Sequence, residues 1–478
     1  TPRTMAVPAF LVLALLTAAA IGVNRRSPRL FEILVAGAAF ALALKARRNL
    51  PIFAIAAAPI LLRNAAAAWS GRGATAPAVA GGATGESSRA GGRRAFVPAL
   101  LLAAAASALT VDVASNRFFL RAPTERWFGL GEIPHYFPDE AAAFVERSRL
   151  PGQVFHPLGI GGYLIHAWGG DRRVFIDGRN DPYLHGVLET YLAAVADPAA
   201  FEDLVRKYQV TTVLWPHEWA LEGRALLKRL SEGHGWTLAH LDAGAAVYVR
   251  DDVAGPMTAA GSMPPLGVSP EDRLNVLRQQ LAQRPFAGPP IREIALAHYL
   301  GIVGDAAGAE SFLRGAIATI PGSAPLRHDL GLALERQGRR DEALAAYRAA
   351  AAIDPRFAPA QSALASLALE KGDLDEAGRR AADAWRLGDR SARTFATRAR
   401  LFEQQGKQPE AEAIWDEAVR TVPGHTGLLL GAARAHARRG DAYGAALLYE
   451  QILRRSPDDP VAQQERSALG AVTTPTGR

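Results

Sequence analysis

The feature that most constrains this chain is a pattern that returns every 34 residues from Pro290 to Asp459. Glycine occupies one register of the pattern in all five periods, and alanine occupies another. A third register holds Pro in four periods and Asp389 in the remaining one. Three registers in phase indicate repetition of one structural unit. The glycines are Gly304, Gly338, Gly372, Gly406 and Gly440, the alanines are Ala309, Ala343, Ala377, Ala411 and Ala445, and the prolines are Pro321, Pro355, Pro423 and Pro457.

Each period predicts a pair of helices. A first helix of about 14 residues ends at the Gly, which adopts the left-handed conformation of a helix stop at little cost. A second helix begins with acidic pairs such as Asp341 and Glu342 and ends at the Pro. A small residue early in each period lets the two helices approach, and larger side chains fill the remaining space. The small residues are Ala297, Gly331, Ala365, Ala399 and Ala433, and the larger ones are Leu313, Tyr347, Trp415 and Tyr449, with Ala381 in the third period.

The array resembles the tetratricopeptide repeat in length and in its small, large and Pro positions. The resemblance covers five units, 290–323, 324–357, 358–391, 392–425 and 426–459. It implies a right-handed superhelix whose concave groove is lined by the first helix of each pair and binds a protein or peptide. The groove is expected to be basic with few acids, which suits an acidic peptide or a terminal carboxylate. The alternative is that these side chains are ordinary solvated charges. The groove candidates are Arg292, Arg327, Gln361, Arg393, Arg400 and Arg434, accompanied by His298, Phe402 and His436.

Composition excludes several kinds of site. The 478 residues are enough for about three domains, and the absence of Cys excludes disulfides, thiolate metal sites and Cys nucleophiles. The net charge of +7 comes from the N-terminal part, because residues 1–115 carry 12 Lys and Arg against three acids, whereas residues 290–470 carry 24 of each sign. This location favours membrane flanks over a nucleic-acid surface. We find no Walker or metal-ligand spacing, so no metal or other cofactor is predicted.

Four apolar runs predict a multi-pass membrane region over residues 1–115. They are Met5–Val23, Leu30–Leu44, Leu50–Trp69 and Ala95–Val111, with a flexible Gly-rich loop at 71–92. The first run has 19 residues, enough to cross about 30 Å of hydrocarbon as a helix. A signal peptide and a buried Ala-rich bundle are the alternatives.

Lys and Arg near the ends of these runs predict the orientation. They are more numerous on the side that holds Arg25, Arg26, Arg63 and Arg72, so this side is expected to be cytoplasmic. Everything after Ser115 then lies on the external or periplasmic side of the inner membrane. The chain begins with Thr1 almost directly before the first run, which suggests a piece of a larger membrane protein.

Residues 130–250 predict a small α/β domain. The expected strands are Gln153–His156, Arg173–Asp177, Val210–Trp215, Trp236–Leu241 and Ala245–Arg250, and the expected helices are Asp139–Arg147, Gly161–Trp168, Val187–Ala196, Ala200–Tyr208 and Glu218–Leu230. Strands separated by helices favour a largely parallel sheet, closed by a final hairpin through 242–244. A flexible linker at 251–269 follows, then the solenoid at 270–470 with a capping helix at Pro270–Gln283. After a last short helix we expect a frayed tail at 471–478.

Two motifs of the α/β domain are candidates for substrate contact. In Gly159–Leu164, the glycines Gly161 and Gly162 would let a backbone approach closely, and Tyr163 follows them. Phe175–Tyr183 is a strand that ends in polar residues at the carboxyl edge of the sheet, where α/β folds bind ligands. Its candidates are Asp177 and Arg179, which are expected to pair, together with Asn180 and Asp181. The alternative is that these residues form turns which Arg179 braces.

Residues 1–250 also resemble the C-terminal half of multi-pass membrane glycosyltransferases that use polyprenyl-linked sugars. The resemblance is carried by Arg47–Pro51 after the apolar helices and by the segments GGYLI and VFIDGRNDPY. The sequence departs from the family where His156–Ile160 replaces the acceptor-binding Trp and Asp residues. The catalytic carboxylates of the family lie in an N-terminal half that this sequence does not contain. We therefore assign no catalytic residue.

Three functions follow from these patterns. The first is a membrane-anchored scaffold whose repeat array binds a partner protein. The second is the C-terminal portion of a membrane glycosyltransferase without its catalytic half. The third is an α/β domain that serves only for packing.

Overall fold

The computed structural model describes residues 135–179, 186–259, 270–283, 290–456 and 458–473, together with scattered positions between residues 14 and 63. The chain divides into two compact units, Thr1–Phe118 and Phe119–Arg478. Within the residues so described, no helix is both long enough and apolar enough to cross a bilayer. The four predicted membrane runs lie mostly outside the described residues, and the loop at 71–92 lies wholly outside them. The membrane region therefore stays a prediction.

The α/β domain contains a four-stranded sheet in the order β1-β2-β4-β3. Only β1 and β2 are parallel, whereas β4 is antiparallel to both of its neighbours. The expectation of a largely parallel sheet is therefore wrong, while the hairpin of β3 and β4 is confirmed. The strands are β1 (Gln153–Phe155), β2 (Val210–Pro216), β3 (Trp236–Leu241) and β4 (Ala245–Arg250), and the helices are α6 (Asp139–Arg147), α7 (Gly161–Ala167), α8 (Val187–Ala196), α9 (Pro198–Tyr208), α10 (Arg224–Ser231) and α11 (Asp251–Ala259), with short 3-10 turns η2 (Leu158–Ile160) and η4 (His217–Trp219).

Arg173–Asp177 is not a strand, although the sequence predicts one. The segment runs beside β1, but side chains supply its bonds. The backbone N–H of Phe175 donates to His156 Nε2 at 3.1 Å, and Gln153 Nε2 donates to the carbonyl of Arg173 at 3.1 Å. Because side chains take the place of the backbone ladder, the segment stays close to the sheet without joining it.

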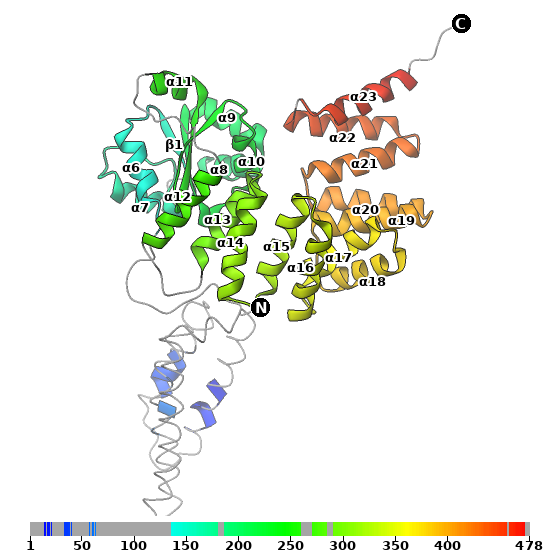
Figure 1. Ribbon diagram of the computed structural model, residues 1–478, viewed down its shortest axis with the longest axis horizontal. Helices are drawn as coiled ribbons and strands as arrows, with labels where there is room; N and C mark the ends of the chain where they lie inside the picture. The colour runs from blue at the N-terminus through cyan, green and yellow to red at the C-terminus, as the bar shows by residue number, and fades with distance from the viewer. Residues whose placement is uncertain are drawn as a thin grey trace, which may run out of the picture. The chain divides into compact units, whose positions relative to one another are not determined.

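The strands of the sheet bury both faces. All seven residues of β2 are buried, and successive side chains point to opposite sides. Val213 and Trp215 pack into the core beneath α8, α9 and α10, whereas Leu214 packs into a second core beneath α6 and α7. Figure 1 shows the two helical layers on either side of the strands.

The segment predicted as a flexible linker begins with a helix. α11 follows β4 directly and contacts both β3 and β4. Only residues 260–269 of the predicted linker lie outside the described residues. Of the Gly and Pro residues that suggested a linker, Gly255 and Pro256 lie within this helix.

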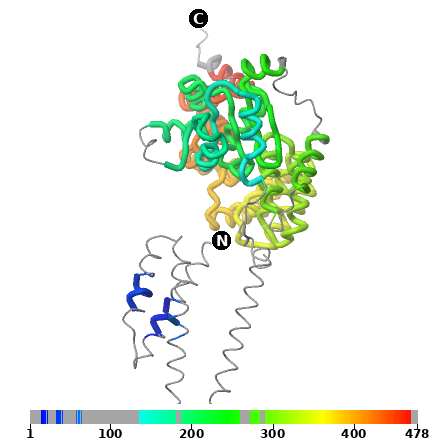
Figure 2. Tube along the Cα trace, turned by 90° about the vertical axis from the view of Figure 1, so that its left-hand side faces the viewer, coloured from blue at the N-terminus to red at the C-terminus, as the bar shows by residue number. Residues whose placement is uncertain are grey.

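The repeat array has the predicted helix pairs (Figures 1 and 2). Each of the five register glycines has a positive φ, between 75° and 93°, and so ends a first helix as expected. The helices are the cap α12 (Pro270–Gln283), the first helices α13 (Ile291–Ile302), α15 (Ala324–Arg336), α17 (Ala358–Glu370), α19 (Ala392–Gln404) and α21 (Thr426–Arg438), the second helices α14 (Ala306–Thr319), α16 (Arg340–Ile353), α18 (Leu374–Arg386), α20 (Gln408–Thr421) and α22 (Ala442–Arg455), and the terminal α23 (Pro460–Thr473). The last helix has 14 residues, so the expectation of a short helix is wrong.

The small and large registers pack against each other. A Cβ atom on Gly331 would overlap the ring of Tyr347, and the phenol of Tyr347 donates to Glu335 on the neighbouring helix at 2.6 Å. Gly331 is therefore required by the size of its partner. The large residue of the fourth repeat makes the corresponding hydrogen bond, since Trp415 Nε1 donates to Glu403 on the neighbouring helix at 2.9 Å.

The third repeat replaces its missing Pro with a different stop. Gly388 has a φ of +88° and ends α18, and the carboxylate of Asp389 accepts from the backbone of Ser391 at 2.8 Å and from the Thr394 hydroxyl at 2.8 Å. A left-handed Gly and a capping Asp thus turn the chain where the other repeats use Pro.

The α/β domain and the first repeat share one hydrophobic core. At their junction the hydroxyls of Tyr248 and Tyr299 are 2.9 Å apart, and the ring of His217 lies 4.5 Å from that of Tyr299. The backbone of Ala243 donates to Gln280 of α12 at 2.9 Å. The α/β domain and the first repeat are therefore packed directly against each other.

Candidate functional site

The two motifs of the α/β domain lie against each other. Gly161 begins α7 directly over the backbone of Ile176 and Asp177, where a Cβ atom would overlap the carbonyl of Ile176. The close approach that Gly161 permits is therefore to this chain itself. Gly162 is exposed and has open space around it.

Asp177 and Arg179 form the predicted pair. The carboxylate of Asp177 is only 2% exposed, and it accepts from the backbone N, Nε and Nη2 of Arg179 at 2.8, 3.0 and 2.6 Å. The Arg179 side chain is largely exposed. This geometry is that of an Asp turn braced by its own arginine. Asn180 and Asp181 lie outside the described residues.

Tyr163 contacts the segment around the start of α6. Its hydroxyl donates to Asp139 at 2.5 Å, and its ring stacks on Phe137 with centroids 4.8 Å apart. Tyr163 therefore ties α7 to the start of α6.

Two buried histidines of the α/β domain are neutral. Burial lowers the pKa of His156 to about 4 and that of His217 to about 4. His156 Nδ1 donates to the Pro157 carbonyl at 3.0 Å, which leaves Nε2 to accept from Phe175. Both ring nitrogens of His156 are thus used in holding the segment beside β1. In the part of the chain that the structure describes, no cluster of His, Asp and Glu is arranged to hold a metal ion.

Three of the groove candidates make contacts with other residues of the array. Arg292 is buried, with its guanidinium 4.0 Å from Glu293. Arg327 Nη2 donates to the Pro321 carbonyl at 3.1 Å. Gln361 is buried and accepts from Arg380 at 2.8 Å.

The other three groove candidates lie on the first helices of repeats four and five. Arg393 pairs with Glu335 at 3.0 Å, and Arg434 pairs with Glu465 at 2.6 Å. Arg400 is exposed on α19. The expectation of few acids is therefore not met beside Arg393 and Arg434.

The structure adds cations that the sequence patterns missed. Burial lowers the pKa of Arg336, at the end of α15, and the charges of Arg224 and Arg393 lower it further. Burial also lowers the pKa of His425, which caps α21, and the charges of Arg224 and Lys228 lower it further. Because Arg224 and Lys228 belong to α10, the α/β domain and the array direct like charges toward one another. We call Arg224, Lys228, Arg336 and Arg393 the cationic cluster, and His425 is a neighbouring imidazole whose charged form these cations disfavour.

The α/β domain contacts both ends of the array. α10 contacts α13 of the first repeat, and α9 contacts α22 of the fifth. At the second contact Arg455 Nε lies 3.9 Å from the carboxylate of Asp197. A cavity of about 360 Å³ lies here between α8–α10 and the last repeat. No local sequence signal predicts this contact, because Asp197 and Arg455 lie far apart in the chain.

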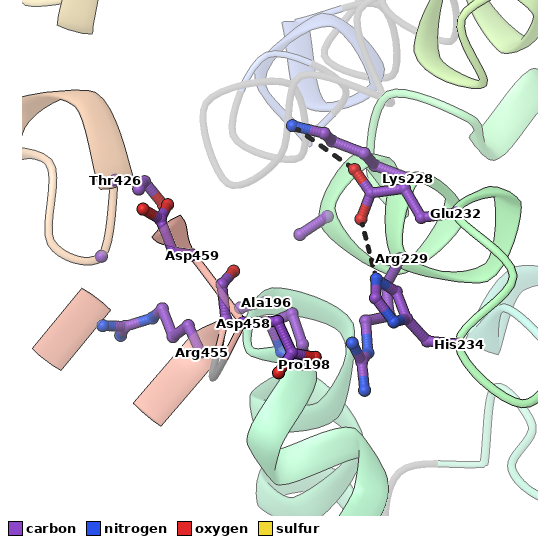
Figure 3. A pocket seen from close by; sticks show the side chains of 13 residues that line it. Ala196, Pro198, Lys228, Arg229, Glu232, His234, Thr426, Arg455, Asp458 and Asp459 are labelled. Carbon is purple, nitrogen blue, oxygen red and sulfur yellow. Dashed lines mark ion pairs between the residues drawn. The ribbon is translucent and has the colours of Figure 1, made fainter. Parts of the chain in front are cut away.

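Charges of both signs line this cavity. Figure 3 shows Lys228, Glu232 and His234 on one side and Arg455 with Asp458 on the other. Glu232 pairs with Lys228 at 3.9 Å and with His234 at 3.5 Å. The cavity is therefore a polar opening beside the cationic cluster.

Comparisons with known proteins concern the repeat array. Two family models, each described as tetratricopeptide repeat, match residues 324–357 and residues 397–460. A search of curated protein sequences finds no match to the chain. These comparisons give no support to the glycosyltransferase resemblance of residues 1–250.

Several solved structures are similar to part of the chain. A thermophilic TPR protein from Thermus thermophilus is 20% identical with a TM-score of 0.34, and the match covers 38% of this chain and 99% of that protein. PilF of Pseudomonas aeruginosa is 19% identical with a TM-score of 0.33, covering 38% of this chain and 88% of PilF. YrrB, described as a TPR protein with an unusual peptide-binding site, is 16% identical with a TM-score of 0.28, covering 37% of this chain and 92% of YrrB.

The identity of the array rests on its own geometry together with the two family matches. Five helix pairs, repeated every 34 residues, end their first helices at left-handed glycines. In the second pair the small Gly331 packs against the ring of Tyr347. The chain is a tetratricopeptide repeat protein, and the family models match its repeats at residues 324–357 and 397–460.

Proposed function

We propose that this chain is a membrane-anchored scaffold that binds an acidic segment of a partner protein between its repeat array and α10 of the α/β domain. The tetratricopeptide fold is a protein interaction scaffold, and the first helices of its repeats provide the binding surface. In this chain α17 contacts α19 and α19 contacts α21, so the first helices of the last three repeats form a continuous layer.

The observation that carries the proposal is the cationic cluster. Arg224, Arg336 and Arg393 come from three separate elements, and the charges of Arg224 and Arg393 both act on Arg336. Like charges held together repel, and an anionic ligand relieves that repulsion on binding.

The acid nearest to the cluster is already engaged. Glu335 accepts from the Tyr347 hydroxyl at 2.6 Å and pairs with Arg393 at 3.0 Å. Glu335 and Glu232 are two carboxylates against the four cations of the cluster, which leaves an excess of positive charge. Carboxylates of a peptide would form charge-assisted hydrogen bonds with the guanidinium groups.

Binding of an acidic peptide to the full chain tests the proposal. The probe is a fluorescein-labelled Glu-rich dodecapeptide, and fluorescence polarisation measures its affinity, with a Gln-rich peptide of equal length as the comparison. We expect the Glu-rich peptide to bind, and we expect the double variant Arg224→Glu with Lys228→Glu to weaken binding at least tenfold. Both side chains are exposed on α10, so this variant should fold.

Arg348→Glu is the matched control. Arg348 is exposed on the second helix of its repeat, outside the first-helix layer. It should change the affinity less than twofold. Equal losses for the control and for the α10 variant, or equal binding of the Gln-rich peptide, would rule out this groove.

The membrane anchor is the second part of the proposal. It rests on the four apolar runs of residues 1–115 and on their Arg-rich flanks, and it puts the α/β domain and the array on the external side. Alkaline extraction of membranes should leave the chain in the pellet, and protease added from outside should cleave the array. Release of the intact chain by alkaline extraction would contradict the anchor.

A further inference from the structure

A second cavity, of about 260 Å³, lies where the α/β domain meets the first repeat. Its lining comes from α10, β3, β4, α12, α13 and the turn before α14. Apolar side chains form part of its wall, including Trp236, Leu238, Leu241 and Leu300. Cavities of about 300–1,000 Å³ hold drug-sized ligands, so this one suits a smaller molecule of about a dozen non-hydrogen atoms.

A pair of phenols lines the cavity. Tyr248 and Tyr299 are each 1% exposed, and their oxygens are 2.9 Å apart. Burial raises the pKa of Tyr248 to about 12 and that of Tyr299 well above its usual value, so both are neutral. Two neutral phenols carry two O–H donors, and the bond between them uses one. Over the described residues, the other O–H has no protein acceptor.

A cation lies next to the phenols. Arg273 of α12 lines the same cavity, and its charge acts on both Tyr248 and Tyr299. Its Nε is buried and has no hydrogen-bond partner within the described part of the chain. A guanidinium N–H and a phenol O–H that both lack acceptors select a ligand with a carboxylate.

The same lining contains one carboxylate. Asp305 Oδ1 accepts from the backbone of Gly308 at 2.8 Å and caps α14. An ionised carboxylate has about four acceptor sites, so one cap leaves capacity for an ammonium group. The cavity therefore offers one cation, one anion and apolar walls.

We propose that this cavity binds a free α-amino acid with an apolar side chain. The ligand carboxylate binds Arg273 and the phenol pair, its ammonium binds Asp305, and its side chain packs on Trp236 and Leu241. The ligand contacts both the α/β domain and the first repeat. Its binding therefore stabilises their junction by mass action. This inference is independent of the peptide groove.

Calorimetric titration of the full chain with three probes tests the proposal. L-phenylalanine has both charged groups, 3-phenylpropionate lacks the ammonium, and phenethylamine lacks the carboxylate. We expect phenylalanine to bind with one site per chain, and we expect each of the other two to bind at least tenfold more weakly. Absence of phenylalanine binding at millimolar concentration, or equal affinity for 3-phenylpropionate, would overturn it.

Two variants separate the roles of the charges. Asp305→Asn keeps a good helix cap but removes the charge, so phenylalanine should lose its advantage over 3-phenylpropionate. Arg273→Met keeps an apolar stem without the charge, and it should weaken the binding of phenylalanine at least tenfold. The control Arg278→Met lies on the same helix, is exposed and should change nothing. Equal effects of the two Arg variants, or an unchanged preference in Asp305→Asn, would refute the assignment.

Discussion

The repeat array and the α/β domain reach their folds by different routes. Each repeat packs through one rule, such as Gly331 against Tyr347, which recurs at a fixed spacing. The α/β domain depends on contacts that occur once, such as the bond from Phe175 to the buried His156. The difference teaches that periodic contacts are readable from sequence, whereas a single buried polar contact is visible only in three dimensions.

A substitution at the junction between the two regions should cause the largest loss of unfolding free energy. Tyr299→Ala removes a buried ring that packs on His217 and bonds to Tyr248, and we expect it to cost about 3–5 kcal/mol of unfolding free energy. Hydrogen exchange should then speed up in both β4 and α13. The exposed Tyr443→Ala is the control and should cost less than about 0.5 kcal/mol. Faster exchange in α13 alone would mean that the two regions fold independently.

The packing rule of the array predicts the next effect. Gly331→Val places two methyl groups where the Tyr347 ring lies, and overpacking of this kind costs about 3 kcal/mol. Gly315 is helical and exposed with open space around it, so Gly315→Ala should stabilise the array by about 0.5–1 kcal/mol. Chemical denaturation measures both changes. A Gly331→Val variant as stable as the original would show that the small register is not needed.

A His–Asp–His contact between the first two repeats predicts a smaller, pH-dependent effect. Burial acts to raise the pKa of Asp329, but the bonds from His298 and His328 outweigh it and lower the pKa to about 2. A depressed pKa contributes stability that is present above the unfolded value of about 4 and is lost as the pH falls toward 2.

Asp329→Asn should therefore remove about 2 kcal/mol of the stability difference between pH 5 and pH 2. Denaturant titrations at the two pH values measure it. Asp341→Asn, at a highly exposed carboxylate, should leave the pH dependence as it was. If Asp329→Asn left the difference in unfolding free energy between pH 5 and pH 2 unchanged, the assigned contact would be contradicted.

Much of the fold follows from sequence. The five glycine stops, the helix at 270–283 and the hairpin of β3 and β4 are confirmed. The segment 173–177, predicted as a strand, is apolar enough for a sheet. Its backbone groups bond to the side chains of Gln153 and His156 instead of to a neighbouring strand. Local sequence patterns do not show whether a backbone group bonds to a side chain or to a neighbouring strand.

The candidate sites were less predictable. Pairing of Asp177 with Arg179 follows from their spacing and is confirmed. The contributions of Arg224 and Lys228 could not be predicted, because they depend on how the array curves back to α10. The phenol pair at the second cavity likewise joins residues from β4 and α13.

The central claim is that the α/β domain bounds the groove of the array at both ends. The chain contains no Cys, so spin labels can be attached at introduced positions without background. We suggest measuring the distance between labels in the double variant Lys228→Cys with Thr426→Cys, whose two positions line the same cavity. A single narrow distribution at short distance is the predicted result. A broad distribution extending to long distances would contradict the account, because the last repeat would then move freely away from α10.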